Sequence, residues 1–198
     1  MSTVRSTLDR LVSYAGFIAA AILLVAALLL TWASAFIGDQ VNQQLSEQHI
    51  IMPTADAYGS LPQADQDALA PYAGQQMTTG PEAKAYANHY ILVHMNETVK
   101  STYEALGIDQ STGYAYAQIP SRAACAEDAT STKCTQLSAV RDTIFQGSTL
   151  RGLLLYGYAF ATIGTIAMYA SIGAYIGAVL MLILAILGII HARRVEKI

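Results

Sequence analysis

The sequence predicts an all-α membrane protein in which two transmembrane helices extend into an extracytoplasmic helical domain. Of its 198 residues, 54% are hydrophobic and only 13% are charged, and residues 152–190 contain no charged side chain at all. A second apolar segment covers residues 11–31, and about 20 such residues suffice to cross a bilayer as a helix. Charge is also segregated along the chain: residues 38–150 hold twelve acidic and five basic side chains, whereas both ends are net basic. A basic cytoplasmic rim and an acidic outer domain are typical of cytoplasmic N- and C-termini, with the central domain outside the plasma membrane.

The N-terminal part is expected to be a cytoplasmic tail over residues 1–10, followed by the first transmembrane helix over residues 11–37. Trp32 lies where an aromatic anchor is expected at the outer interface. Residues 33–35 (Ala-Ser-Ala) resemble a signal-peptidase site, but the preceding apolar run is longer than the core of an ordinary signal peptide. We therefore expect an uncleaved signal anchor.

The extracytoplasmic domain is expected to occupy residues 38–151 and to be helical. The first helix should continue in a polar form until Met52-Pro53 ends it, and a short helix should form around Gln63–Leu69. Thr79, Pro81 and Glu82 form a helix-start signature, and Gly107 is a natural stop. These signals predict a helix over 81–106, and apolar spacing predicts another over 135–146 that continues into the C-terminal segment.

The C-terminal apolar segment is too long for one crossing, because 39 helical residues extend about 58 Å and a bilayer core is about 30 Å thick. Residues 169–190 are expected to be the second transmembrane helix, with Tyr169 at the outer interface and Arg193 and Arg194 anchoring the inner one. Residues 152–168 would then be an apolar helical extension outside the bilayer that protein must cover. Residues 191–198 would form a basic cytoplasmic tail. A turn near Ser171 and Gly173 is the alternative.

The two cysteines, Cys125 and Cys134, both fall in the predicted outer domain. In an oxidising compartment they are expected to form a disulfide that closes a short loop; two unpaired thiols are the alternative. Small residues favour close packing of transmembrane helices. Gly16 and Ala20 in the first span, and Gly173 and Gly177 in the second, are therefore expected to pack the two helices together, although some such motifs face lipid.

Three stretches carry a resemblance to a known family, namely residues 72–80 (YAGQQMTTG), 82–89 (EAKAYANH) and 149–155 (TLRGLLL). They resemble small two-span membrane proteins of actinobacteria that are often labelled aromatic ring-opening dioxygenase. The likeness covers most of the chain apart from residues 108–134. It implies an accessory subunit associated with a respiratory supercomplex of the cytochrome bc–oxidase kind.

The dioxygenase label can be tested against the chemistry of the sequence. A non-haem iron oxygenase commonly uses two histidines and a carboxylate, for which His89, His94 and Glu97 are the candidates. On one regular helix His89 lies about 140° around from His94, so the three side chains cannot share an ion, and His49 would have to be recruited from elsewhere. We therefore expect no metal, no cofactor and no enzymatic activity.

The function expected from these observations is that of a non-catalytic accessory or assembly subunit. Its partners would be integral membrane subunits of a larger complex and membrane lipids, since an acidic domain disfavours nucleic acid. Neither span contains an ionisable side chain of the kind that transporters use. The candidate partner-binding residues are Tyr156, Tyr158, Phe160 and Tyr169. The alternative is a cell-envelope sensor or ligand-binding membrane protein.

Overall fold

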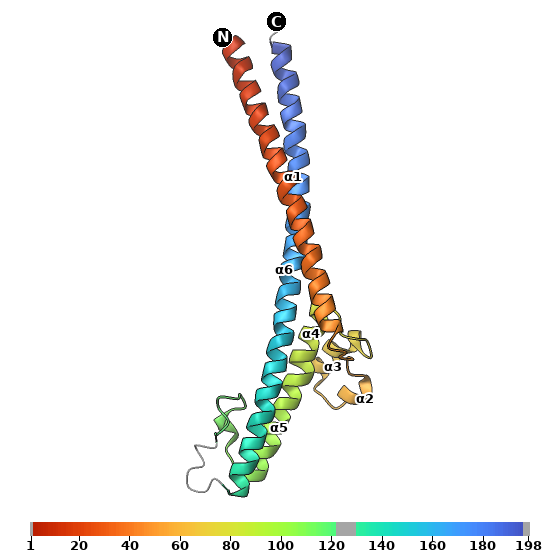
Figure 1. The fold of residues 1–198 in the computed structure, drawn as a ribbon, viewed down its shortest axis with the longest axis vertical. Coiled ribbons are helices and arrows are strands. Elements are labelled where there is room, and N and C mark those ends of the chain that lie inside the picture. The colour runs from red at the N-terminus through yellow and green to blue at the C-terminus, as the bar shows by residue number, and fades with distance from the viewer. Residues whose placement is uncertain (1, 122–129, 196–198) are drawn as a thin grey trace. The chain divides into compact units, whose positions relative to one another are not determined.

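The computed structural model describes residues 2–121 and 130–195, and the elements in them are helices joined by turns (Figure 1). In chain order they are α1 (Ser2–Ser46), α2 (Ala55–Tyr58), α3 (Gln63–Leu69), the 3-10 turn η1 (Ala70–Tyr72), α4 (Gly80–Tyr86), the π-helical turn η2 (Ala87–Ile91), α5 (Leu92–Leu106), the 3-10 turn η3 (Gln110–Thr112) and α6 (Thr132–Val195). An isolated β-bridge pairs Ile51 with Gln76. The all-α prediction is confirmed for the described residues.

The chain divides into two compact units, each described by itself below. The helix-pair unit comprises Met1–Asp39 and Thr162–Ile198, and the helical domain comprises residues 40–161. In the helix-pair unit α1 and α6 run antiparallel, so that both chain ends lie at the same end of the pair (Figure 1). Both helices are long and apolar enough to cross a membrane, which indicates a membrane protein.

The two helices of the pair meet along a seam of small residues repeated every seven positions. These residues are Ser6, Ser13, Ala20, Ala27 and Ser34 on α1, and Gly164, Ser171, Ala178, Ala185 and Ala192 on α6. A seven-residue repeat keeps one face of a helix against its partner, as in a left-handed coiled coil. The approach is close, because a Cβ added to Gly16 would lie 3.1 Å from Cβ of Ala185. The Ser34 hydroxyl also donates a hydrogen bond of 2.8 Å to the carbonyl oxygen of Gly164.

The predicted packing glycines lie in different surroundings. Gly16 and Ala20 are buried between the helices, and a Cβ on Gly177 would make an ordinary 3.4 Å contact with Leu23. A Cβ on Gly173, by contrast, would meet no heavy atom of the described chain within 4 Å. The repeat that organises the pair is therefore seven residues long, not the four of Gly173-x-x-x-Gly177.

The predicted interface anchors all lie at the surface of the helix-pair unit. Trp32 and Tyr169 are exposed, and the Trp32 ring stacks on Phe36 with centroids 5.6 Å apart. Arg193 and Arg194 are exposed in the last turn of α6. Which side of a membrane each end faces stays a prediction.

In the helical domain, α5 packs against the first part of α6 around an apolar core. Its buried members are Val99, Tyr103, Ile119, Leu137, Val140 and Ile144. Helix α5 ends where expected, because Gly107 adopts a left-handed conformation (φ 62°). The amide of Ile108 then donates to the carbonyl of Tyr103, and that of Gly107 to Glu104, which satisfies two carbonyls at the helix end. The polypeptide after Gly107 thereby turns back to cover the core.

The segment between α1 and α4 differs in detail from the expectation. Helix α1 ends at Ser46, before the predicted stop at Met52-Pro53, and the chain turns through His49, which has a positive φ of 51°. Met52 itself is buried and its backbone pairs with Gln75. The short helix predicted around Gln63–Leu69 is confirmed as α3.

The helix predicted over residues 81–106 is present but not regular. It begins as expected, with Thr79 as N-cap and the Glu82 carboxylate accepting the amides of Thr78 (2.6 Å) and Thr79 (2.8 Å). A π-helical turn, η2, then separates α4 from α5. The expectation of one regular helix is wrong at this turn, and the contacts that accompany the turn are described below.

The described residues include only one of the two cysteines of the predicted disulfide. Cys134 is buried in the first turn of α6, whereas Cys125 lies outside the described residues. The Cys125–Cys134 disulfide therefore stays a prediction.

Candidate docking surface

Helix α6 presents two different faces within the helical domain. The face toward α4, η2 and α5 carries Arg151, Leu154 and Tyr158, which are buried or half-buried. Tyr158 interacts with Lys84, whose Nζ lies 3.3 Å from the phenolic oxygen and 4.6 Å from the ring centroid. This face is covered by the chain itself.

The opposite face carries a stripe of large apolar side chains that the described chain leaves uncovered. Leu153, Tyr156 and Phe160, here called the docking stripe, are 64%, 67% and 56% exposed. They are three and four residues apart, so they lie on one side of the helix. Single exposed apolar residues are ordinary, but an aligned set with two aromatic rings is typical of an interaction site.

No charge lies on the outward face of this part of α6. Between Asp142 and Arg193, α6 has one Asp, Glu, Lys or Arg side chain, that of Arg151. Arg151 points to the other side, where its Nη2 donates a hydrogen bond of 2.8 Å to Oδ1 of Asn88. The docking stripe is therefore apolar without a charged rim on its own helix.

The four candidate partner-binding residues fall into three groups. Tyr156 and Phe160 lie together on the docking stripe, and Tyr158 is held on the covered face by Lys84. Tyr169 is exposed, but it belongs to the helix-pair unit. Sequence reasoning missed Leu153, although the alternating spacing of three and four residues from Leu153 to Phe160 is a signal that could have found it.

On the covered side of α6, the π-helical turn η2 contacts both α3 and α6. Asn88 binds Arg151 of α6, and the next residue, His89, donates from Nδ1 to Oδ1 of Asp65 on α3 at 2.7 Å. A π-turn is rare and occurs mostly as a single turn inside an α-helix, frequently at a functional site. Here the two side-chain contacts tie α3 and α6 to the same turn.

Arg151 is incompletely satisfied at this junction. Its Nε atom is buried and has no hydrogen-bond partner among the described residues. A buried guanidinium donor without an acceptor is costly. Loss of the Asn88 contact would leave a second nitrogen of this guanidinium without an acceptor, so it should lower stability more than loss of an exposed side-chain hydrogen bond would.

An aromatic row continues from the junction along α4, η2 and α5. The rings of Tyr86 and Tyr90 stack with centroids 5.2 Å apart, and His94 follows Tyr90 at 4.4 Å. Desolvation by burial raises the pKa of Tyr86, with a smaller contribution from Tyr90. The Nδ1 of His94 carries the proton, because it donates to the backbone carbonyl of Tyr90 at 2.8 Å.

The iron-ligand candidates do not form a joint site in the part of the chain that is described. His89 is bound to Asp65 and His94 to the Tyr90 carbonyl, while Glu97 is exposed on α5 and His49 on the turn after α1. No group of three or more His, Cys, Asp or Glu side chains among the described residues could hold a metal ion.

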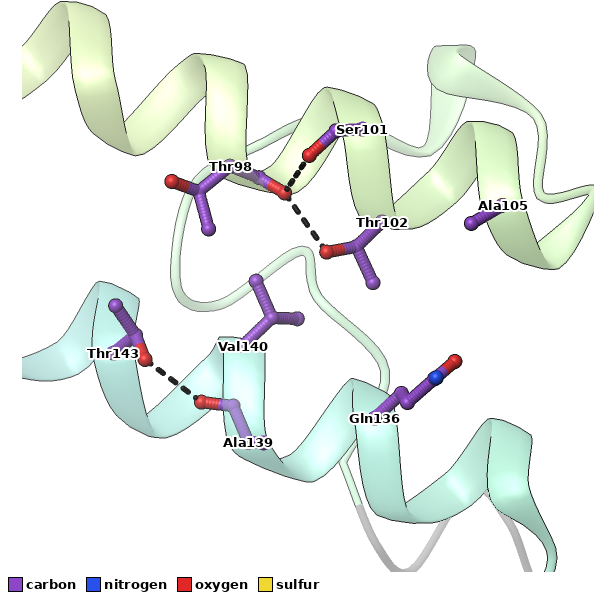
Figure 2. A pocket seen from close by; sticks show the side chains of 8 residues that line it. All are labelled: Thr98, Ser101, Thr102, Ala105, Gln136, Ala139, Val140 and Thr143. Carbon is purple, nitrogen blue, oxygen red and sulfur yellow. Dashed lines mark hydrogen bonds between the residues drawn. The ribbon is translucent and has the colours of Figure 1, made fainter.

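A groove of about 390 Å³ runs between α5 and the start of α6 (Figure 2). It is lined by small or polar side chains, namely Thr98, Ser101, Thr102, Ala105, Gln136, Ala139, Val140 and Thr143. Several of their hydroxyls donate to carbonyls of their own helix, as Thr102 does to Thr98 and Thr143 to Ala139 (Figure 2). The lining offers a ligand neither a charge nor an aromatic face, so the groove does not favour a particular ligand class.

No protein-family profile, curated protein sequence or solved structure matches this chain.

Proposed function

We propose that this chain is a non-catalytic accessory or assembly subunit that docks on a larger membrane complex. The observation that carries the proposal is the exposure of Leu153, Tyr156 and Phe160 along one uncharged face of α6. Fully burying an apolar side chain of this size stabilises by about 1.5–3 kcal/mol. A partner that covers the stripe would therefore gain several kcal/mol that the isolated chain forgoes.

The membrane arrangement belongs to the same proposal. Both chain ends would face the cytoplasm, since the Lys and Arg residues near them favour that side. The acidic helical domain would then lie outside the plasma membrane, where a Cys125–Cys134 disulfide can form.

The partner complex proposed is a respiratory supercomplex of actinobacteria, of the cytochrome bc–oxidase kind. Its support is the resemblance of residues 72–80, 82–89 and 149–155 to small two-span actinobacterial proteins. A chain with two transmembrane helices and an uncovered apolar stripe suits lateral attachment to such an assembly.

The proposal is tested by affinity purification of the full chain from native membranes in a mild detergent. Wild-type protein should bring down respiratory subunits in fixed stoichiometry, whereas recovery of a lone monomer would overturn the proposal. Replacing both stripe aromatics, Tyr156→Ser with Phe160→Ser, should reduce co-purification by at least about tenfold, because aromatic anchors dominate interface energy. The matched control is Ile51→Ser, which removes another exposed apolar side chain from the helical domain and should leave co-purification unchanged.

A further inference from the structure

We infer that the docking stripe is covered by a helix that rises from a membrane-spanning segment of the partner. This inference rests on the proposed function and specifies the chemistry of the occupant. Three observations favour such a helix over a soluble protein, and a second copy of this chain is distinguished by the test below.

The first observation is the spacing of the stripe. Thr149, Leu153, Tyr156 and Phe160 are separated by four, three and four residues, and all four are exposed. From Leu153 to Phe160 the spacing is seven residues in two steps, which matches the seam along which one helix packs on another. In the helix-pair unit, α1 already packs on α6 through a seven-residue repeat. The stripe thus has the spacing for a second helix.

The second observation is the small area of the stripe. Aromatic side chains bury about 150–250 Å² each, so two of them with one leucine offer on the order of 400–500 Å², below the roughly 800 Å² per partner of a stable interface. A soluble protein that docked on this stripe alone would bind weakly. A membrane-anchored partner is already confined beside the chain, which raises its effective concentration at the stripe.

The third observation is the distance of the stripe from the proposed membrane span. Phe160 lies nine residues before the span proposed at residues 169–190, and α6 is one helix over these residues. Nine residues of helix rise about 14 Å. A partner helix that emerges from the bilayer beside α6 would therefore reach the stripe after about two and a half turns.

The side chains also define what the partner helix presents. Large knobs at Leu153, Tyr156 and Phe160 need holes, so the facing positions should be small residues. Tyr156 is 67% exposed, so a partner that covers the stripe would also bury its hydroxyl, and a buried Tyr hydroxyl usually finds a hydrogen-bond partner. The partner should therefore supply an acceptor opposite Tyr156, and it needs no charge, because the stripe has none to match.

The test is site-specific photo-crosslinking of the full chain in native membranes, with p-benzoylphenylalanine at Tyr156 and, as the control, at Asn96 on the exposed surface of α5. Mass spectrometry then identifies the crosslinked peptide. We expect the Tyr156 position to react with an integral membrane protein, in an apolar spanning segment or the helix turns directly beyond it. The yield from Asn96 should be at least tenfold lower.

Other products overturn the inference in distinguishable ways. Crosslinking to a soluble protein, to a second copy of this chain or to lipid alone means that the occupant is not a spanning helix. Absence of a product while respiratory subunits still co-purify means that docking occurs elsewhere, so the inference fails and the proposed function survives. Loss of co-purification from the wild-type chain removes the proposed function and, with it, the inference.

Discussion

Arg151 and Asn88 are joined by a hydrogen bond of 2.8 Å that links α6 to the π-helical turn η2. The contact matters because Nε of the same guanidinium is buried without a partner among the described residues. Asn88→Ala should therefore lower the free energy of unfolding by about 1–3 kcal/mol. Denaturant unfolding of the full chain in detergent, followed by circular dichroism, measures the change. Asn96→Ala, which truncates an exposed asparagine, is the control and should stay within about 0.5 kcal/mol of wild type.

Gly80 allows α4 to approach α6 closely, since an added Cβ would lie 2.5 Å from Cβ of Ala161 and 3.1 Å from Cα of Tyr158. Gly80→Ala should destabilise the helical domain by about 1–3 kcal/mol through overpacking. Gly152→Ala is the matched comparison, because it meets no atom within 4 Å and lies inside α6. It should stabilise the protein by up to about 1 kcal/mol. Equal thermal unfolding of the two variants would contradict the close approach.

Ala185 fills the seam of the helix pair, opposite Gly16. Ala185→Leu should force the helices apart and cost about 1–3 kcal/mol. Ala170→Leu adds the same side-chain volume at an exposed position of α6, and it should have little effect. Thermal unfolding in detergent compares the two variants, and a stable Ala185→Leu protein would argue against the seven-residue seam.

The phenol of Tyr103 should make the free energy of unfolding depend on pH in the alkaline range. Burial raises the pKa of its phenol, with Tyr114 adding to the shift. Because the folded-state pKa lies above the ordinary value of about 10, the stabilisation is complete below that value and is lost as pH rises through the raised pKa. Tyr86 has a pKa raised in the same direction by burial.

A Tyr103→Phe variant tests this dependence. It should lose about 1 kcal/mol at neutral pH, since the hydroxyl donates to the carbonyl of Gly113 at 3.0 Å. It should also show a shallower loss of stability between about pH 9 and pH 11. Denaturant unfolding at several pH values, with phenolate absorbance followed in parallel, measures both effects. Parallel stability curves for the variant and wild type would contradict the prediction.

The predicted Cys125–Cys134 disulfide can be checked by mass spectrometry of the purified chain with and without reductant. Reduction should lower the free energy of unfolding by about 2–3 kcal/mol, and Cys134→Ser should lower it by a similar amount. Reductant should then have no further effect on the variant. We expect an alkylating reagent to leave the mass unchanged without reductant and to modify both thiols after reduction. Alkylation of both thiols without reduction would rule the disulfide out.

Local signals in the sequence predicted several elements closely, because they act through the backbone nearby. Thr79 and Glu82 start α4 by binding amides within three or four residues, and Gly107 ends α5 through its own left-handed conformation. The π-turn could not be predicted in this way. The side-chain contacts that accompany it come from Asp65 and Arg151, which are distant in sequence.

The interaction surface was only partly predictable for a related reason. Composition indicated that residues 152–168 are too apolar to stand alone, but it did not separate the two faces of the helix. Tyr156 and Tyr158 are two residues apart, and only the packing of Lys84 against Tyr158 shows which of them the chain covers. The seven-residue seam was not predicted, because small residues four positions apart are the more familiar packing signal, whereas alanine and serine at seven-residue intervals make most of the seam.

The glycine, alanine and serine residues between α1 and α6 also keep the helix pair narrow, because small side chains let the two backbones approach closely. In a bilayer, such a narrow pair would displace fewer lipid molecules than two helices held apart by large side chains.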